Sequence, residues 1–466
     1  MNNSSLNNSK EILRLLLSAL LLLLVTAHSA SAQVSCGDTL TTDTVLTNDL
    51  LGCVGDGLIV GADNITIDCS CYTISAPSRT STGIVLNGRS GVTVKNCVVV
   101  NFSTGISVEG SSSGNLLMSN RTEDNVWGFV IDSSTSNTLR DNKAYDRDNG
   151  FTLRSSADNN VLVGNQSADS PFGFVLNASS GNTLTDNSAD NLTGSTTTSY
   201  GFHLDGATGN TLRMNEAFSN SYGFHLTNSS TSNTLRDNDA NDNGTGILIS
   251  GFSDDNVLTD NEANSNGKHG IHLTSVSGNS LRNNDANSNI EDGFHVIGTT
   301  GANLFRGNDA NANDRGFFLQ NADDNTIREN EANDNTRDGI NLYGSVDNAV
   351  RENTTNGNDG NGIVLYASSN GNSLRNNWSD ANDIGIKIDN SDGNFVIGNS
   401  TDDNDRGIVL TTSATSTELR LNLSAGNTSH DAEDASPNCG TNNWTNNNIQ
   451  DVVVNNVTNP NPSCIQ

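Results

Sequence analysis

Residues 238–273 read NDANDNGTGILISGFSDDNVLTDNEANSNGKHGIHL, and one pattern occurs twice within them. An N-x-A-x-x-N segment leads to a glycine, which is followed by two apolar residues with one other residue between them. The same Gly-apolar-x-apolar segment starts at fifteen glycines: Gly83, Gly105, Gly128, Gly150, Gly173, Gly201, Gly223, Gly246, Gly270, Gly293, Gly316, Gly339, Gly362, Gly385 and Gly407. Most spacings are 22 or 23 residues, and one of 28 residues contains a polar insertion at 194–199. Fifteen copies at so regular a period identify a repeat protein.

Each repeat has the periodicity of short β-strands. Four positions of a typical copy are apolar, namely a Leu, an Ala and the two residues that flank an outward residue after the glycine. Such alternation is typical of strands, and no segment shows the i, i+3, i+4, i+7 spacing of an amphipathic helix. Three short strands per repeat, separated by Asn and Gly turns, predict a parallel β-solenoid whose stacked coils share one narrow core. A leucine-rich repeat would need more Leu, and a pentapeptide repeat would keep a five-residue step.

Asn, Ala and Gly recur at fixed places in the repeat. Asn can hydrogen-bond both to its own turn and to the Asn of the next coil, which predicts a ladder. The predicted ladder contains Asn215, Asn238, Asn261, Asn284, Asn308, Asn330, Asn353, Asn377 and Asn399. An alanine column marks where two sheets approach closely: Ala189, Ala217, Ala240, Ala263, Ala286, Ala310 and Ala332. The glycine of each repeat is expected to supply a turn with positive φ.

Composition excludes a thick globular core and a nucleic-acid partner. Of the 466 residues, 33% are apolar and 5% aromatic, against roughly 45–50% apolar in ordinary soluble domains. The 53 Asp and Glu residues outnumber the 23 Lys and Arg residues, which gives a formal net charge of −30. Such a surface repels phosphate backbones. The regular repeat argues against disorder for most of the chain.

The first 32 residues have the layout of a secretory signal peptide. Lys10 and Arg14 precede an apolar run at 15–25, and Ala30 and Ala32 form an A-x-A cleavage site. The run is short for a bilayer span, so no membrane span is expected after cleavage, with an uncleaved anchor helix as the alternative. The sequence therefore predicts a secreted, periplasmic or cell-surface protein.

Seven cysteines lie near the two ends of the chain, where disulfides can fix the ends of a repeat structure. We expect Cys36 to pair with Cys53 and Cys439 to pair with Cys464. The three others are Cys69, Cys71 and Cys97. Because seven is an odd number, one thiol among these three is expected to stay free.

The predicted organisation is a single all-β solenoid of about fifteen coils with 22–23 residues each. A signal peptide at 1–32 precedes an N-terminal cap with the first coil at 33–78. The repeats occupy 79–425, and a C-terminal cap follows at 426–466. Both caps carry disulfides.

The chain resembles the right-handed parallel β-helix proteins of the pectin-lyase-like superfamily, and most closely their NosD-like repeats. The coil N-x-[LIV]-x-x-N followed by N-x-x-G-[IF]-x-L, from Gly83 to Leu410, carries this resemblance. The resemblance implies a right-handed β-helix, and it points to a polysaccharide groove on one sheet face. It does not select one activity, since this scaffold carries lyases, hydrolases, epimerases and adhesins. The catalytic cluster of pectate lyases, the D-P-H-D motif of alginate epimerases and the calcium-binding nonapeptide are missing from the sequence.

Four of the seven histidines fall in one outward column of the repeat. The column is the residue between the two apolar residues that follow each glycine: Val85, Ser107, Val130, Thr152, Val175, His203, His225, Leu248, His272, His295, Phe318, Asn341, Val364, Lys387 and Val409. Stacked coils bring such side chains about 5 Å apart. His203, Asp205 and His225 are therefore predicted to form one candidate catalytic site.

A second candidate site consists of His272 and His295, with Lys268 and His269 just upstream. Histidines so placed can transfer protons or bind a metal ion. The alternative is an exposed β-face on which His is merely tolerated. No metal site is assigned from the sequence.

Three aromatic residues extend the same face. Phe318 belongs to the histidine column, and Tyr343 and Tyr366 lie two residues further along their strands. Aromatic rings in a row are typical of a strip on which sugar rings stack. These three residues are the predicted ligand-binding candidates.

We expect a secreted protein that binds extracellular polysaccharide on an outward sheet face. The sequence leaves open whether the protein also processes the polymer, in which case lyase or epimerase chemistry is expected. The alternative is a non-catalytic structural or interaction rod at the cell surface. No cofactor is assigned, and calcium is left as the one candidate ion. A copper-delivery role has support from the resemblance alone.

Overall fold

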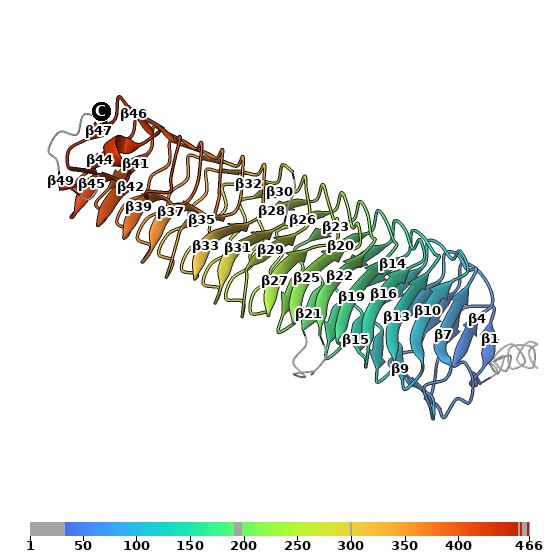
Figure 1. Ribbon diagram of the computed structural model, residues 1–466. Helices are drawn as coiled ribbons and strands as arrows, with labels where there is room; N and C mark the ends of the chain where they lie inside the picture. The colour runs from blue at the N-terminus through green and yellow to red at the C-terminus, as the bar shows by residue number, and fades with distance from the viewer. Residues whose placement is uncertain (1–32, 191–197, 299–300, 455–456, 459–463, 466) are drawn as a thin grey trace, which may run out of the picture. The chain divides into compact units, whose positions relative to one another are not determined.

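A computed structural model shows Cys36–Gln466 as an elongated stack of β-strand coils (Figure 1). The structure describes residues 33–190, 198–298, 301–454, 457–458 and 464–465. The predicted signal peptide at 1–32 and most of the insertion at 194–199 lie outside the described residues. Each coil contributes short strands to parallel sheets that run along the stack, which makes a right-handed parallel β-solenoid as predicted.

The widest sheet, sheet A, has 20 strands and carries the candidate site. Its strands, in chain order, are β1 (Asp38–Leu40), β4 (Leu58–Val60), β7 (Thr82–Asn87), β10 (Thr104–Glu109), β13 (Trp127–Asp132), β16 (Asn149–Arg154), β19 (Phe172–Asn177), β22 (Tyr200–Asp205), β25 (Tyr222–Thr227), β27 (Thr245–Ile249), β29 (Ile271–Thr274), β31 (Asp292–Ile297), β33 (Arg315–Gln320), β35 (Ile340–Tyr343), β37 (Asn361–Tyr366), β39 (Ile384–Ile388), β42 (Arg406–Leu410), β45 (His430–Asp434), β48 (Val452–Val454) and β49 (Val457–Thr458). All neighbours pair in parallel except β48 and β49, which are antiparallel.

Sheet B has one strand from every coil, from β2 (Thr44–Val45) to β46 (Asn443–Thr445). Its eighteen strands exceed the predicted number of about fifteen coils, because segments before Gly83 and after Gly407 also stack as coils. The third side of the solenoid is sheet C, which has eight strands from β3 (Leu50–Leu51) to β24 (Glu216–Phe218). Three more follow at β41 (Ser400–Asp402), β44 (Leu423–Ala425) and β47 (Asn448–Ile449), and single bridges connect the coils between these two sets.

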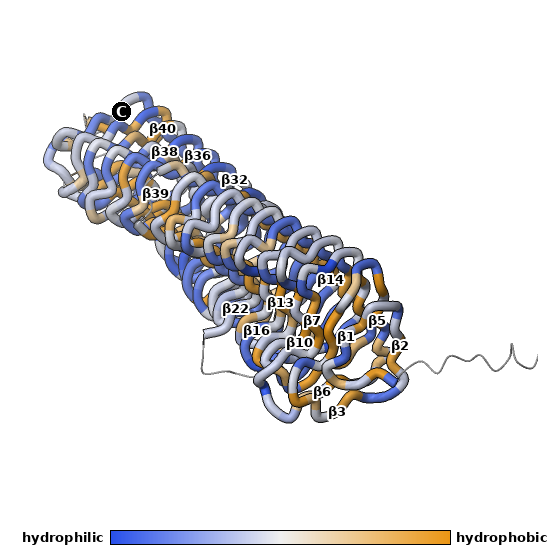
Figure 2. The backbone as a smooth tube through the Cα atoms, turned by 90° about the vertical axis from the view of Figure 1, so that its right-hand side faces the viewer, coloured by the Kyte–Doolittle hydropathy of each residue, from blue (hydrophilic) through white to orange (hydrophobic). Residues whose placement is uncertain are grey.

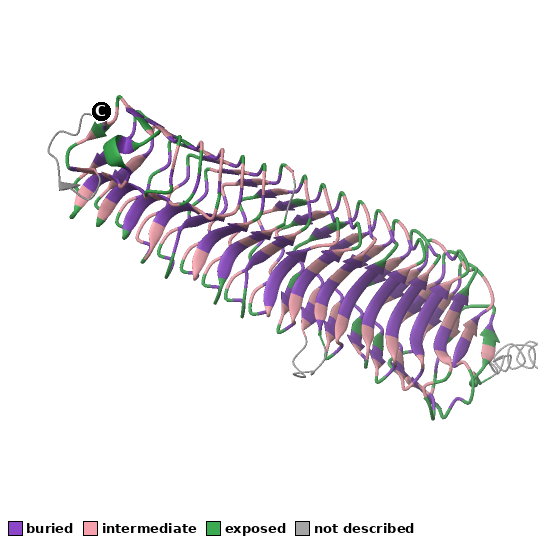
Figure 3. Ribbon diagram, viewed as in Figure 1, coloured by how far each residue is buried: buried purple, intermediate pink, exposed green. Residues whose placement is uncertain are grey.

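The core is narrow, and within it similar apolar side chains stack on one another in successive coils. Figure 3 shows the buried residues concentrated along the sheets, and Figure 2 shows apolar and polar residues alternating around the coils. Inside sheet A the rings of Phe129, Phe151, Phe174, Phe202 and Phe224 stack in register, with successive centroids 4.7–4.8 Å apart. This spacing equals the separation of neighbouring strands, so each coil adds one ring to a continuous column.

The glycine of each repeat is needed for close approach and not for a positive φ, which corrects the prediction. None of the fifteen repeat glycines has a positive φ. A Cβ added to Gly201 would lie 2.7 Å from the Cβ of Ala217 and 2.7 Å from the carbonyl oxygen of Gly223. The two columns contain small residues for the same reason, because a larger side chain at either position would collide with the other column.

The predicted asparagine ladder is confirmed. Asn261 donates from its backbone N–H and from Nδ2 to Oδ1 of Asn284, at 3.1 and 2.9 Å, and Nδ2 also donates to the carbonyl oxygen of Leu235 at 3.0 Å. The same bonds recur from coil to coil, and two further ladders line the other corners of the coil, one through Asn233 and one through Asn243. These amides satisfy buried turn backbone that water cannot reach.

The disulfides fasten both ends of the solenoid. The predicted pairs Cys36–Cys53 and Cys439–Cys464 are confirmed. A third disulfide joins Cys69 to Cys97, which leaves Cys71 as the exposed free thiol. Among the described residues, no helix is long and apolar enough to cross a membrane.

Candidate functional site

The outer face of sheet A carries three parallel columns of side chains. The predicted column is the middle one, and the strand pairing places its members side by side, for example His203 beside His225 and His272 beside His295. The first column precedes each repeat glycine: Trp127, Asn149, Phe172, Tyr200, Tyr222 and Thr245 in six successive coils. The third column lies two residues after the middle one: Asp132, Arg154, Asn177, Asp205 and Thr227.

The side chains of the middle column are more buried than is usual for side chains that point away from the core. Val130 is 2% exposed and Thr152 is 7% exposed, although both point away from the core. The longer side chains of the first and third columns flank them and cover them. The expected exposed β-face is therefore a shallow trough with a buried floor.

Aromatic and imidazole rings form a continuous cluster on this face. The ring centroids of Tyr200 and His203 are 4.6 Å apart, and those of His203 and His225 are 5.2 Å apart. Phe172 and Tyr222 extend the cluster by one coil on each side of Tyr200, at 5.4 and 5.5 Å. The cluster comes from three successive strands, β19, β22 and β25.

Burial keeps both histidines of this cluster neutral at physiological pH. Desolvation lowers the pKa of His203, against the opposing attraction of the Asp205 carboxylate. Desolvation and the nearby His203 ring lower the pKa of His225 to about 4. A neutral imidazole can donate one hydrogen bond and accept another. His225 Nε2 lies 3.0 Å from Ser250 Oγ. His225 Nδ1 is buried, and no described residue forms a hydrogen bond with it.

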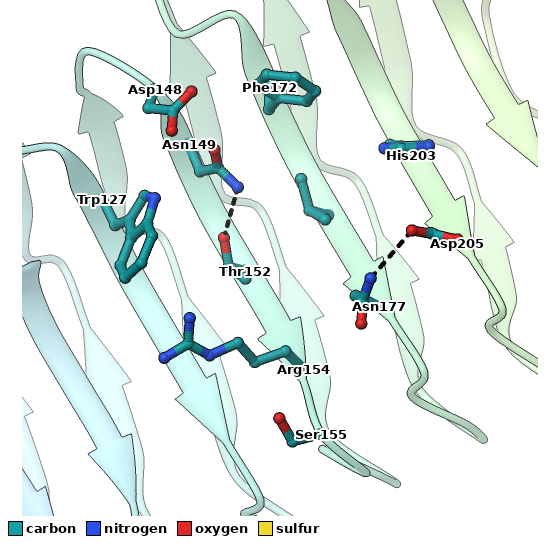
Figure 4. A pocket seen from close by; sticks show the side chains of 11 residues that line it. Trp127, Asp148, Asn149, Thr152, Arg154, Ser155, Phe172, Asn177, His203 and Asp205 are labelled. Carbon is teal, nitrogen blue, oxygen red and sulfur yellow. Dashed lines mark hydrogen bonds between the residues drawn. The ribbon is translucent and has the colours of Figure 1, made fainter.

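A pocket of about 460 Å³ lies at one end of this cluster (Figure 4). It is lined by Trp127, Asp148, Asn149, Thr152, Arg154, Ser155, Phe172, Val175, Asn177, His203 and Asp205. The guanidinium of Arg154 lies 5.0 Å from the ring centroid of Trp127, and its Nε is 2.7 Å from Asp132 Oδ2. The pocket therefore combines two aromatic side chains with a set of hydrogen-bonding groups, which is the composition of a small-molecule site.

Two family descriptions match the chain. The right-handed β-helix region matches residues 128–263 and 231–379, which together span more than half of the chain. The chain belongs to the right-handed β-helix family. Residues 37–193 of this β-helix protein also match the periplasmic copper-binding protein family, NosD. No curated protein matches the chain.

Several solved structures are similar to this β-helix protein. A double mutant of the periplasmic alginate epimerase AlgG has 12% sequence identity and a TM-score of 0.40, over 67% of this chain and 77% of that chain. The A-module of the Azotobacter vinelandii mannuronan C-5 epimerase AlgE6 has 13% identity and a TM-score of 0.31, over 81% of this chain and 91% of that chain. The catalytic domain of the GH87 alpha-1,3-glucanase has 13% identity and a TM-score of 0.31, over 77% of this chain and 59% of that chain.

The structure brings the first predicted group together only in part. His203 and His225 stack on each other, and Asp205 lies on the same strand as His203. The Asp205 carboxylate accepts hydrogen bonds from Asn177 Nδ2 at 3.0 Å and from Asn228 Nδ2 at 2.7 Å. Asp205 is therefore positioned by amides, and it borders the pocket as an oriented acceptor.

The second predicted pair is part of a larger group. His272 and His295 stack at 4.8 Å, and His269 makes edge contacts with both, at 5.1 and 4.4 Å. His269 lies in the first column because it immediately precedes the repeat glycine Gly270, and its neighbour in the following coil is Asp292, which precedes Gly293. Desolvation and the neighbouring histidines lower the pKa of His272 to about 3.

The predicted aromatic strip is only partly accessible. Phe318 is 7% exposed, and the guanidinium of Arg315 lies 3.6 Å from its ring centroid, so its face is covered. Tyr343 and Tyr366 lie in the third column with their rings edge-on at 4.8 Å, and both are partly exposed. Phe318 therefore has no free face for a sugar, whereas the two tyrosines do have accessible edges.

The first column is not among the residues predicted from the sequence. Trp127, Phe172, Tyr200 and Tyr222 each stand immediately before a repeat glycine. Reading that position as a column would have shown four aromatic residues in five coils. The turn predicted at the glycine hides this position, which is in fact the first outward residue of the sheet A strand.

Proposed function

We propose that this β-helix protein binds a neutral extracellular polysaccharide along the outer face of sheet A. The pocket between Trp127 and Phe172 carries the proposal. Its aromatic side chains can contact the apolar faces of a sugar ring, while Asn149, Asn177 and Asp205 can hydrogen-bond sugar hydroxyl groups. Few other ligand classes need both kinds of contact in one open trough.

The shape of the site favours a chain over a single sugar. The aromatic and histidine cluster continues from the pocket through Phe172, Tyr200 and Tyr222, so rings recur at one-coil intervals along the solenoid. A polymer lying parallel to the solenoid axis would meet this cluster over several sugar units. Many weak contacts along a chain add up to useful affinity.

Charge favours a neutral polymer over a polyuronate. The pocket contains the carboxylates of Asp148 and Asp205, and the only cation among its lining residues, Arg154, is already paired with Asp132. The chain as a whole has a net charge of −30. A carboxylate-bearing polymer would be repelled both on approach and in the site.

The disulfides support an extracellular or periplasmic location for this function. Three disulfides in one chain are typical of an oxidising compartment, and extracellular polysaccharides are found in such compartments. We therefore infer that the protein works outside the cytoplasm.

Replacing Trp127 or Phe172 by Ala is expected to weaken polysaccharide binding about tenfold or more, because each change removes an aromatic contact at the pocket. Isothermal titration with a panel of neutral and uronate oligosaccharides measures the affinity. Trp378→Ala is the matched control, since Trp378 is 48% exposed but lies at an isolated bridge away from sheet A. The control should bind as the unchanged protein does.

The same panel decides between the candidate functions. Tighter binding of uronates than of neutral polymers would contradict the charge argument. Equal losses in Trp127→Ala and Trp378→Ala would contradict the assignment of the site. No binding to any polymer would favour a structural or interaction rod, and new proton NMR signals after incubation would show turnover in addition to binding.

A further inference from the structure

A second group of polar side chains lies on sheet A beyond the aromatic cluster. His269 and Asp292 are neighbours in the first column, and His295 belongs to the middle column of strand β31. Asp292 has no exposed side-chain surface, and the side chains of His269 and His295 are 9% and 14% exposed. Glu291 precedes Asp292, and its half-exposed side chain borders the group.

Four atoms of this group that could bind a metal ion form a chain in which successive atoms are separated by nearly equal distances. Glu291 Oε2 lies 3.3 Å from His269 Nε2, which lies 3.1 Å from His295 Nδ1. His295 Nδ1 in turn lies 3.1 Å from Asp292 Oδ2. One donor atom from each of His269, Asp292 and His295 fits within 4.8 Å of the others.

These separations match the edges of a zinc coordination shell. Zinc binds imidazole nitrogen at about 2.0–2.1 Å and carboxylate oxygen at about 2.0–2.2 Å with tetrahedral geometry. Two ligands of a tetrahedron with such bonds lie roughly 3.3–3.5 Å apart. Three of the six edges of such a tetrahedron are therefore within a few tenths of an ångström of that value, and the atoms of the remaining pairs would move closer together on binding the ion.

Arg315 orients the Asp292 carboxylate by hydrogen bonds, as residues that contact metal ligands commonly do. Arg315 Nε donates to Asp292 Oδ1 at 2.7 Å and Arg315 Nη2 donates to Oδ2 at 3.4 Å, while Oδ2 also faces His295 Nδ1 at 3.1 Å. The Arg315 guanidinium is itself packed on Phe318 at 3.6 Å. Such partners fix ligand orientation, and losing one typically weakens metal binding about 10–100-fold.

Two histidine nitrogens in and beside this group lack hydrogen-bond partners among the described residues. His272 Nε2 and His295 Nε2 are buried and have no hydrogen-bond partner among the residues that the structure describes. Neither nitrogen is one of the four proposed ligand atoms, so the site rests on the distances between those atoms. A hydrogen-bond network without an ion is the competing explanation of the same distances.

We propose that His269, His295, Asp292 and Glu291 bind one divalent transition-metal ion of the zinc type. Two imidazoles with carboxylate oxygens form a donor set that suits zinc, and calcium and magnesium prefer all-oxygen sites. The ion would lie on the same face as the aromatic cluster, a few coils further along. The proposal does not depend on polysaccharide binding, and its test contains no sugar.

Chelator-treated protein titrated with zinc sulfate should bind one ion per chain in the calorimeter. His269→Gln and His295→Gln should each weaken binding at least about 100-fold, because each removes one ligand, and Arg315→Gln should weaken it about 10–100-fold. His430→Gln is the matched control, since His430 Nε2 lies 3.1 Å from Glu433 Oε2 in a His–carboxylate pair that lacks a second imidazole. The control should keep full zinc affinity.

Two readouts do not require a variant to fold. Cobalt added to the unchanged protein should give the intense visible absorption of a tetrahedral nitrogen–oxygen site, and zinc should displace it. Crystals soaked in zinc should show one anomalous peak within bonding distance of His269 and His295. Absence of one-to-one binding, or binding that survives both histidine changes, would overturn the proposal in favour of the hydrogen-bond network.

Discussion

Replacing Asp146 by Asn is expected to raise the free energy of unfolding by about 3 kcal/mol at pH 7.5. Asp146 is 2% exposed and stands where neighbouring coils of its ladder carry an amide or a hydroxyl. Burial raises the pKa of its carboxyl from 3.8 to about 6, against the hydrogen bonds from Thr122 and Asn125. A difference of about two pKa units, at about 1.4 kcal/mol each, is the source of the estimate.

The sign of the pH dependence follows from the raised pKa. The folded protein holds the proton on Asp146 up to about pH 6, whereas the unfolded chain releases it near pH 3.8. Stability is therefore lost as the pH rises from about 4 to about 6, and the full penalty is present above that range. The advantage of Asp146→Asn should be about 3 kcal/mol at pH 7.5 and close to zero at pH 3, as measured by guanidinium unfolding at both values.

The geometry around Asp146 has room for the amide. Asn125 donates to Asp146 Oδ1 from its backbone N–H and from Nδ2, at 3.0 and 2.8 Å, and the introduced amide would keep that oxygen. Thr122 Oγ1 now donates to Asp146 Oδ2 at 2.6 Å, and its hydroxyl can rotate to accept from the new amide nitrogen.

Asp141→Asn separates this effect from a general gain in net charge. Asp141 lies in the same coil with a side chain that is 61% exposed, and the substitution removes the same charge. Its effect should stay within about 0.5 kcal/mol. An equal gain in both variants would assign the effect to the overall charge of −30 and contradict the role of burial.

Much of the fold could be predicted because the same residue types recur at the same positions of every coil. The spacing of Asn238, Asn261 and Asn284 fixed the coil length, and the alternation around Gly246 fixed which residues face the core. The register of the middle column followed from the spacing alone, since each strand pairs with its counterpart one coil later.

The candidate site was less predictable because it depends on what lies beside each column. Alternation says that Phe318 points outward, but only the three-dimensional structure shows Arg315 lying over it. His269 and Asp292 each precede a repeat glycine and lie 23 residues apart, so their contact belongs to the first column and not to the middle column that was read from the sequence. Contacts between columns arise from side-chain length and direction, which periodicity does not contain.

Asn261→Ala should lower the free energy of unfolding by about 3–5 kcal/mol, because the change leaves the backbone N–H of Asn238 and the carbonyl oxygen of Leu235 without partners in the interior. Each orphaned buried group costs roughly 1–3 kcal/mol. Guanidinium unfolding measures the total, and amide hydrogen exchange should show faster exchange at Asn238 than in the unchanged protein. Asn87→Ala is the control, because Asn87 is exposed and its side chain donates only to Glu109.

Asn261→Asp tests whether the Asn261 side chain stabilises the protein through its hydrogen bonds or only by filling space. Both hydrogens of Asn261 Nδ2 point at acceptors, Leu235 O and Asn284 Oδ1, so a carboxylate there would face two oxygens. At position 146 the second carboxylate oxygen instead meets the hydroxyl of Thr122, which can donate. Asn261→Asp should therefore destabilise at pH 7.5 at least as much as Asn261→Ala, and part of the loss should return at pH 3, where the protonated carboxyl donates again. A loss below about 1 kcal/mol in both variants would show that the amide ladder contributes little to stability.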